Sequence, residues 1–351
     1  MKLGIDPAAV HALAAWFRDH GRPYHFRRHP TPYSVWILEV MSQQTQIARA
    51  EERHRRWLEH FPDIRTLAAA GEEEVLREWE GLGYYSRARN IHRAACQVMD
   101  AGGEMPTTRD GLLSLPGIGA YTAASIASIV HGEPVAAVDA NVRRVLRRVF
   151  AAPDLADGRI ETLLAGAFEH EPAGVINEAL MELGEQLCRK TRPRCLECPL
   201  AEGCLACKSG RTELERQKPG SGRTRLSIAV ACLRCRGRYL VEEAPQGELW
   251  AGLWRFPCRI IGQEEDPEEV VRQLGAERGL RLGLLQPLGG KYTGGHTRYS
   301  IHLLPYCGSA RRALRAGGAG DWIDPREDGG RTFPTLFRRL LEALPVKDRK
   351  D

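Results

Sequence analysis

A glycine-containing turn between two helical stretches constrains this chain most. Residues 115–119 read Leu-Pro-Gly-Ile-Gly, and residues 120–130 are mostly small or apolar. Two glycines around one apolar residue let the backbone adopt positive φ and leave consecutive N–H groups pointing outward at the start of the next helix. A helix start of this kind binds anions. The pattern predicts two helices whose turn either only connects them or also contacts a phosphate.

An aspartate begins the next predicted helix. Asp139 is followed by a basic run made of Arg143, Arg144, Arg147 and Arg148. Aspartate is a good N-cap, a role worth about 1 kcal/mol. An N-cap carboxylate can also take part in catalysis, so the two interpretations of Asp139 are compatible.

Glu39 is the second carboxyl group of interest. A helix is predicted over residues 34–46, and Glu39 has apolar neighbours on both sides. If it faces the protein interior, desolvation raises its pKa and keeps it protonated near neutral pH, as a general acid requires. If it lies on a solvent-facing stripe, it is an ordinary surface glutamate.

The cysteines indicate metal binding. Ten of the 351 residues are cysteine, and the chain has neither a signal peptide nor a run of eighteen apolar residues. We therefore expect a soluble, intracellular protein without a disulfide framework. Four thiols follow the pattern Cys188-x6-Cys195-x2-Cys198-x5-Cys204. Cys207 complicates the count, because two Cys-x2-Cys pairs would by themselves suit zinc.

Length and periodicity predict more than one domain. Residues 1–210 follow helical periodicity, and the polar stretch 211–224, which contains Pro-Gly-Ser-Gly, indicates a linker. From residue 225 to 351 the pattern changes to strand-like alternation with two helices. The expected strands are 227–233, 239–243, 284–292 and 298–304, and the expected helices are 267–279 and 334–344. The fold class is thus an all-α domain followed by an α+β domain.

Several ordered segments resemble one enzyme family. Residues 38–45 (Leu-Glu-Val-Met-Ser-Gln-Gln-Thr), 81–90 (Gly-Leu-Gly-Tyr-Tyr-Ser-Arg-Ala-Arg-Asn) and 115–122 (Leu-Pro-Gly-Ile-Gly-Ala-Tyr-Thr) resemble the MutY family. These are the A/G-specific adenine DNA glycosylases, within the endonuclease III superfamily of helix-hairpin-helix glycosylases. Residues 249–257 (Leu-Trp-Ala-Gly-Leu-Trp-Arg-Phe-Pro) resemble the Nudix-like domain with which MutY proteins read 8-oxoguanine.

The resemblance implies a fold and a function. It implies a glycosylase domain over 1–210 with its hairpin near 110–131, and a Nudix-like lesion-recognition domain over 225–351. The expected enzyme is a monofunctional DNA glycosylase that flips out adenine mispaired with 8-oxoguanine or guanine and hydrolyses its N-glycosidic bond in base excision repair. Its partner would be double-stranded DNA with such a mispair. We expect a monomer in the bacterial cytoplasm, associated with the nucleoid through DNA and with no membrane.

The same resemblance assigns residues. Glu39 would protonate adenine at N7 and later activate water, and Asp139 would stay ionised beside the sugar. Tyr121 and Asn141 would orient these two groups. The expected DNA-binding residues are Gln43, Leu82, Tyr85, Gly117, Gly119 and His296. The spacing of Cys188, Cys195, Cys198 and Cys204 matches the ligands of the superfamily's [4Fe–4S] cluster, with Cys207 as a bystander.

Departures from the family define the alternatives. A glycosylase/lyase of the endonuclease III type needs a lysine nucleophile, but Tyr121 holds that position and no lysine lies between Lys2 and Lys190.

The lesion-reading loop has Gly294-Gly295 before His296, where an aromatic residue and a Ser or Thr are usual, so relaxed opposite-base specificity is a second alternative. A noncatalytic DNA-binding iron–sulfur protein is the third. The helix predicted over 267–279 lacks the Arg-Glu and Glu-Glu arrangement with which a Nudix hydrolase binds magnesium, so we expect no nucleotide hydrolysis.

Overall fold

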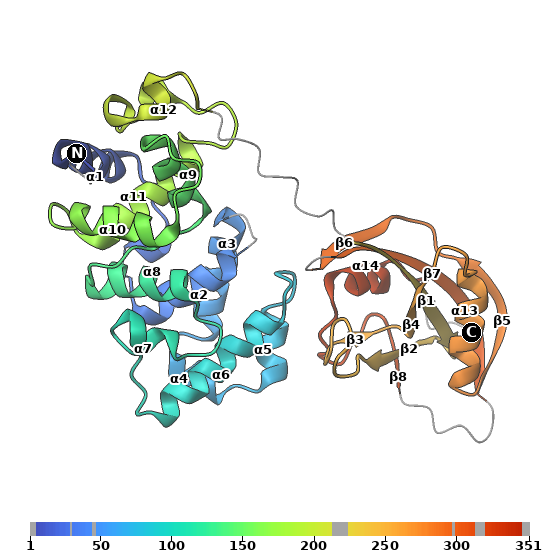
Figure 1. Cartoon of the computed structure of the whole chain (residues 1–351). Helices are drawn as coiled ribbons and strands as arrows, with labels where there is room; N and C mark the ends of the chain where they lie inside the picture. Colours follow the sequence, from blue (N-terminus) through green and yellow to red (C-terminus); the bar gives the residue numbers. More distant parts are fainter. Residues whose placement is uncertain are drawn as a thin grey trace. The chain divides into compact units, whose positions relative to one another are not determined.

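The chain forms two compact units in the computed structural model. The structure describes residues 5–28, 30–43, 47–212, 224–296, 299–312 and 320–345. One unit is Met1–Ala70 with Asn90–Pro219, and the other is Gly71–Arg89 with Gly220–Asp351 (Figure 1). Most of the predicted linker, 211–224, lies outside the described residues, and the proposed domain boundaries stay a prediction. Within the described ranges, no helix is both long and apolar enough to cross a membrane.

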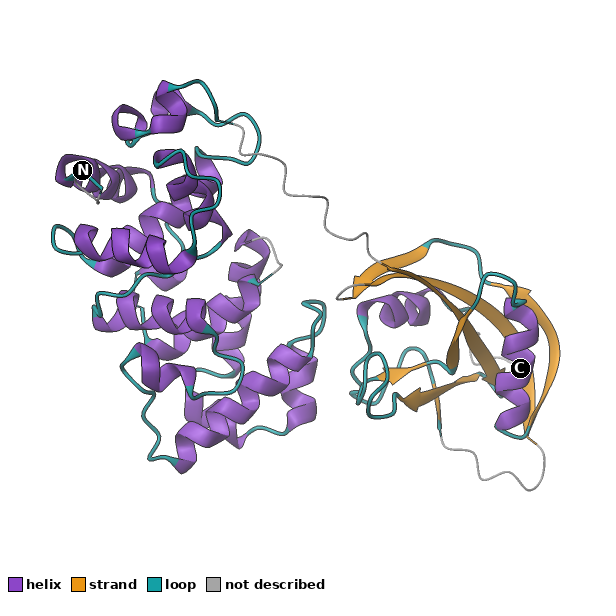
Figure 2. Ribbon diagram, viewed as in Figure 1, coloured by secondary structure: helices purple, strands orange, loops and turns teal. Residues whose placement is uncertain are grey.

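The first unit is helical (Figure 2). Its α-helices are α1 (Pro7–His20), α2 (Pro32–Ser42), α3 (Ile47–His60), α4 (Ile64–Ala69), α7 (Arg109–Leu113), α8 (Ala120–His131), α9 (Ala140–Val149), α10 (Asp157–Ala167), α11 (Ala173–Gln186) and α12 (Leu205–Lys208). Short 3₁₀ turns are η1 (His25–Arg27), η2 (Cys195–Glu197) and η3 (Ala201–Gly203). Helix α6 (Ser86–Asp100) crosses the division between the units.

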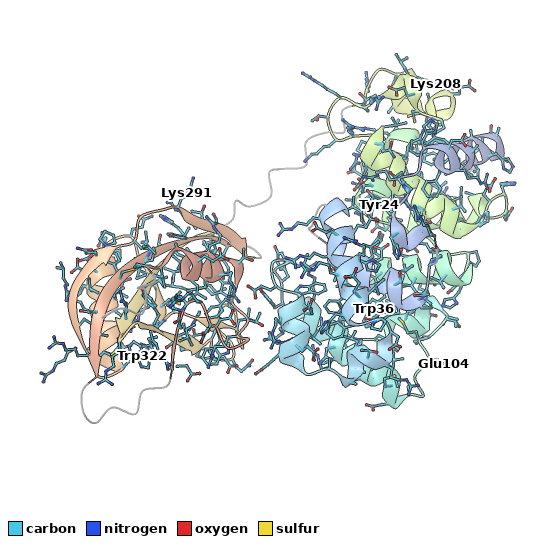
Figure 3. The ribbon with its side chains drawn as sticks, turned by 180° about the vertical axis from the view of Figure 1, so that it is seen from behind. Tyr24, Trp36, Glu104, Lys208, Lys291 and Trp322 are labelled. Atoms are coloured by element: carbon cyan, nitrogen blue, oxygen red, sulfur yellow. The ribbon has the colours of Figure 1, made fainter. Side chains whose placement is uncertain are left out.

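Helices α2 and α8 form the centre of the first unit because they are apolar on most sides. In α2, Trp36 and Met41 are fully buried, and in α8 the residues from Thr122 to Ser128 are all buried. The two helices contact each other, and Trp36 lies among the helices of this unit (Figure 3). Helix α2 ends at Ser42, so the predicted helix over 34–46 is shorter than expected and Gln43 is its C-cap.

A hydrogen-bonded asparagine fixes the segment between α8 and α9. The buried Asn177 side chain donates to the Ser128 hydroxyl and to the Val135 carbonyl, both at 2.9 Å, and accepts from the Ala137 amide at 3.1 Å. A buried amide with several partners holds an irregular segment in one position. This segment leads directly into Asp139.

The second unit contains an eight-stranded sheet with a helix on each face. The strands are β1 (Thr224–Cys235), β2 (Arg238–Glu243), β3 (Trp254–Arg255), β4 (Cys258–Ile261), β5 (Leu280–Pro287), β6 (Tyr292–His296), β7 (Tyr299–Arg312) and β8 (Asp321–Ile323). The main path is β3-β2-β1-β7-β5, with β4 paired to β1, β6 to β7 and β8 to β2. The long β1 and β7 strands are parallel, and helices α13 (Pro267–Glu277) and α14 (Thr335–Ala343) cover the sheet.

Alternation along β1 builds both cores of the second unit. Ile228, Val230 and Cys232 pack in the cluster that includes Phe337 of α14. Ala229, Ala231 and Leu233 pack in the other cluster, with Leu274 of α13. Successive strand residues point to opposite faces, so one continuous apolar run serves two helices. The four expected strands and two expected helices are present, although the strand expected over 284–292 is divided between β5 and β6.

The segment around helix α5 (Glu72–Glu78) packs within the second unit. Arg338 of α14 donates to Glu80 at 2.6 Å, and the Tyr85 hydroxyl donates to the Phe333 carbonyl at 3.1 Å. These residues are far apart in the sequence, and no local pattern indicates their contact.

Candidate active site

One cavity in the first unit brings together all four residues predicted to be catalytic. Its volume is about 220 Å³, well above the roughly 15 Å³ that one buried water needs. Glu39 from α2, Tyr121 from α8, and Asp139 and Asn141 at the start of α9 line it. The remaining lining residues are Arg22, Tyr24, Phe26, Arg27, Leu38, Ser42, Ile47, Ile129, Glu178, Met181, Glu182 and Glu185. Tyr24 is labelled in Figure 3.

Glu39 faces this cavity from an apolar helix. Burial raises the pKa of its carboxyl group to about 7, although hydrogen bonds from Ser125 and Tyr121 oppose the increase. The Ser125 hydroxyl donates to Glu39 Oε1 at 2.6 Å. Glu39 is therefore about half protonated at neutral pH, and the interior interpretation of this residue holds.

Asp139 is both an N-cap and a cavity residue. Its Oδ1 accepts from the Val142 amide at 2.7 Å, and its Oδ2 accepts from Asn141 Nδ2 at 2.9 Å. Burial raises the pKa of Asp139 above its ordinary value, and these N–H donors oppose that increase only in part. Hydrogen bonds to both oxygens stabilise the ionised form.

A chain of hydrogen bonds connects Asp139 to the cysteine segment. Arg144 Nη2 donates to Asn141 Oδ1 and to the Gly184 carbonyl, both at 2.7 Å, and Arg144 Nε donates to the Cys188 carbonyl at 2.8 Å. A Cβ atom on Gly184 would lie 2.6 Å from that of Asn141. Glycine at position 184 therefore permits this close approach.

Three of the cavity residues form an ionic cluster. Arg27 donates to Glu178 at 2.7 Å and to Glu182 at 2.9 Å. Burial raises the pKa of Glu178, while Arg27 acts against that increase. The sequence analysis did not identify this ionic cluster or Ser125. Ser125 lies four residues after Tyr121, on the same helix face, and this spacing is a signal that could have identified it.

Buried apolar residues anchor the glycine turn, and only one of its glycines is needed for its backbone conformation. Leu115 and Ile118 are buried, whereas Gly117 and Gly119 are exposed. Gly117 has φ of 79°, and a Cβ there would lie 2.6 Å from Asn90 Cβ. Gly119 is the N-cap of α8 with φ of −90°, so of this pair only Gly117 adopts the positive φ that glycine permits. The first backbone N–H groups of α8, which have no acceptor within the helix, follow this exposed position.

The other predicted DNA-binding residues occupy different settings. Leu82 and Tyr85 are buried in a strained turn in which Gly81, Gly83 and Tyr84 all have positive φ. Both side chains would have to leave the interior to contact DNA. His296 ends β6, and its side chain lies outside the described part of the structure. The DNA-binding roles of these residues and of Gln43 stay predictions.

Five cysteines line a second cavity in the first unit. They are Cys188, Cys195, Cys198, Cys204 and Cys207. Buried Arg148 donates to the Cys188 carbonyl at 3.2 Å, to Cys188 Sγ at 3.3 Å and to the Arg189 carbonyl at 2.6 Å. Among the described residues, no three His, Cys, Asp or Glu side chains are gathered closely enough to hold one metal ion.

Two family models match the chain. Residues 37–169 match the model for HhH-GPD superfamily base excision DNA repair proteins, and residues 229–343 match the NUDIX domain. A solved structure of endonuclease III in a non-covalent complex with DNA has a TM-score of 0.51 and 28% identity. That similarity covers 57% of this chain and 94% of the endonuclease.

Two curated relatives each match more than two thirds of the chain. The human adenine DNA glycosylase is 33% identical over 70% of this chain, which spans 56% of the human protein. The adenine DNA glycosylase of Buchnera aphidicola is 30% identical over 69% of this chain and 71% of its own length. The chain spans less than two thirds of the mouse, Arabidopsis and rat relatives as well. By its match to the Buchnera protein and to both family models, this chain belongs to the family of the adenine DNA glycosylases.

Proposed function

We propose that this protein is a monofunctional DNA glycosylase that excises adenine mispaired with 8-oxoguanine or guanine. The observation that carries the proposal is the shared cavity of Glu39 and Asp139. One carboxyl group has a pKa of about 7 because it is buried, and the other accepts an N–H on each oxygen. Two carboxyl groups in unlike environments divide acid and electrostatic roles.

The chemistry follows from these two environments. Protonated Glu39 gives its proton to N7 of the flipped adenine, and the electron pair of the C1′–N9 bond leaves with the base. Anionic Asp139 stabilises the positive charge that develops on the sugar. Water then adds to C1′ and gives a proton to the Glu39 carboxylate. Tyr121, whose hydroxyl hydrogen-bonds to Glu39, and Asn141, which holds Asp139, keep both groups in position.

The start of α8 supports DNA as the binding partner. The exposed amides after Gly119 suit a backbone phosphate without requiring a charged side chain. The endonuclease structure that this chain resembles is a complex with DNA. We propose that Gln43, Leu82, Tyr85, Gly117, Gly119 and His296 contact the duplex, with His296 in the unit that reads the opposite base.

Cys188, Cys195, Cys198 and Cys204 are the proposed ligands of a [4Fe–4S] cluster. Their thiols surround one cavity, and burial raises the pKa of the Cys198 thiol to about 11, so a thiolate there needs a cation such as iron. A four-iron cube holds its ligands further apart than a single ion does, which suits thiols that line a cavity without meeting at one point. When bound, the cluster would supply the metal–thiolate bonds that fold this segment.

Single-turnover cleavage of defined duplexes tests the proposed function. Duplexes with adenine opposite 8-oxoguanine, guanine or cytosine are incubated with excess enzyme, and half of each sample is treated with alkali. We expect adenine release from the first two duplexes. Strand cleavage is expected only after alkali, because Tyr121 holds the position of the lyase lysine and no lysine lies between Lys2 and Lys190. Strand cleavage without alkali would indicate a glycosylase/lyase instead.

The same assay tests opposite-base specificity. Gly294 and Gly295 precede His296 in the proposed lesion-reading loop, and faster release opposite 8-oxoguanine than opposite guanine would indicate that this loop reads the lesion. Equal rates opposite 8-oxoguanine and guanine would instead indicate a mismatch glycosylase with relaxed specificity. No release of adenine from any duplex, with DNA binding intact, would indicate a noncatalytic binding protein.

A further inference from the structure

Cys207 is a fifth thiol in the cavity of the proposed cluster. It lies in α12, whose last residue, Lys208, is labelled in Figure 3. Cys207 lines this cavity together with Cys195 and Cys204, and its thiol lies close enough to the Cys195 thiol for the two to interact. Cys207 is therefore more than a residue near the motif.

Cys195 is held less firmly than the other three ligands. Cys188, Cys198 and Cys204 pack against the apolar core that contains Val145, Leu183 and Leu187. Cys195 instead begins the one-turn η2, and the next residue, Leu196, is fully exposed. The fifth thiol thus lies beside the ligand that the fold restrains least.

We propose that Cys207 is a reserve ligand that can replace Cys195 on the cluster. In this exchange the bond between iron and the Cys195 sulfur breaks, and a bond from the Cys207 sulfur to the same iron forms. Cys207 gives its proton to solvent, the released Cys195 thiolate takes one up, and no electron is transferred. This inference rests on the proposed cluster and goes beyond its four-cysteine ligand set.

Iron content in a set of anaerobically purified variants tests the inference. The set contains the wild-type chain, Cys207→Ser, Cys195→Ala, the double variant Cys195→Ala/Cys207→Ser, and Cys198→Ala as the matched control. Iron and acid-labile sulfide are measured per chain, together with the visible absorption of the cluster. We expect Cys207→Ser to match the wild type and Cys195→Ala to retain at least half of the wild-type iron. The double variant and Cys198→Ala are expected to fall at least tenfold.

Alkylation of the native proteins identifies the sulfur that is bound. In the wild type, iodoacetamide should modify Cys207 and spare the four ligands, and in Cys195→Ala it should spare Cys207. An iron-free or insoluble Cys195→Ala protein would overturn the inference, as would Cys207 that remains alkylated in that variant. Equal iron in Cys195→Ala and the double variant would overturn it too. If the wild-type chain contains no iron, the proposed cluster itself is wrong, and this result is distinguishable from failure of the reserve-ligand inference alone.

Discussion

Replacing Ser125 by alanine should shift the pH dependence of adenine release to higher pH. The Ser125 hydroxyl donates to Glu39 Oε1 at 2.6 Å, and this bond stabilises the carboxylate more than the carboxylic acid. Its loss therefore raises the pKa of Glu39 above its value of about 7. Glu39 acts as an acid, so the protonated, active form persists to higher pH.

The size of the shift follows from hydrogen-bond energies. A hydrogen bond to a charged group contributes about 1.5–3 kcal/mol, and one between neutral groups about 0.5–1.5 kcal/mol. The difference of about 1 to 1.5 kcal/mol corresponds to about one pKa unit. At pH 8 the protonated fraction of Glu39 should then rise from about a tenth to about a half, an increase of about fivefold.

The assay is the second-order rate of adenine release at subsaturating enzyme, measured from pH 5.5 to 9 and normalised to each protein's low-pH plateau. These conditions report the pKa of the free enzyme. Ser42→Ala is the matched control, because the Ser42 hydroxyl lies in the same cavity but donates to the Glu39 backbone carbonyl at 2.9 Å. A midpoint that stays unchanged or moves to lower pH in Ser125→Ala would refute the reasoning.

Three further predictions concern stability and the second carboxylate. Because folding raises the pKa of Glu39 from 4.5 to about 7, the stability it contributes is present below pH 4.5 and lost as pH rises to 7. Glu39→Gln should thus stabilise the fold by about 3 kcal/mol at pH 8 and about 1 kcal/mol at pH 5. Equal changes in the free energy of urea unfolding at the two pH values would contradict this. Asn141→Ala removes one N–H donor from Asp139 and should slow single-turnover release about tenfold, whereas an unchanged rate would show that this donor is dispensable. Gly117→Ala should lower the free energy of urea unfolding by about 1–3 kcal/mol, because φ of Gly117 is 79° and Asn90 is close. Gly119→Ala should lower it little. Similar losses of stability in the two variants would be inconsistent with the backbone angles of these glycines.

Local sequence patterns were sufficient for the parts of the site that lie within one element. Asp139 caps α9 because aspartate before a helix start is a local signal. The apolar neighbours of Glu39 in the sequence left an interior and a surface position open, and in the structure burial raises the pKa of this residue to about 7. The change to strand-like sequence after the linker also identified β1 and β7, which extend over the strands expected at 227–233 and 298–304.

Contacts between distant elements could not be predicted in this way. The Ser125–Glu39 bond depends on how α8 packs against α2, and the Arg27–Glu178 pair joins residues 151 positions apart. The proximity of Cys207 to Cys195 depends on the path of a loop with little regular structure. Spacing identifies which residues can share a site, whereas tertiary packing decides which atoms touch.

The central claim is that a protonated Glu39 breaks the bond to a flipped adenine. Its most direct test compares DNA binding and adenine release by Glu39→Gln on a duplex with adenine opposite 8-oxoguanine. We predict that the variant binds within about threefold of the wild-type affinity and that its single-turnover release falls at least about a thousandfold, because the amide cannot supply the proton. Release at the wild-type rate would contradict the claim.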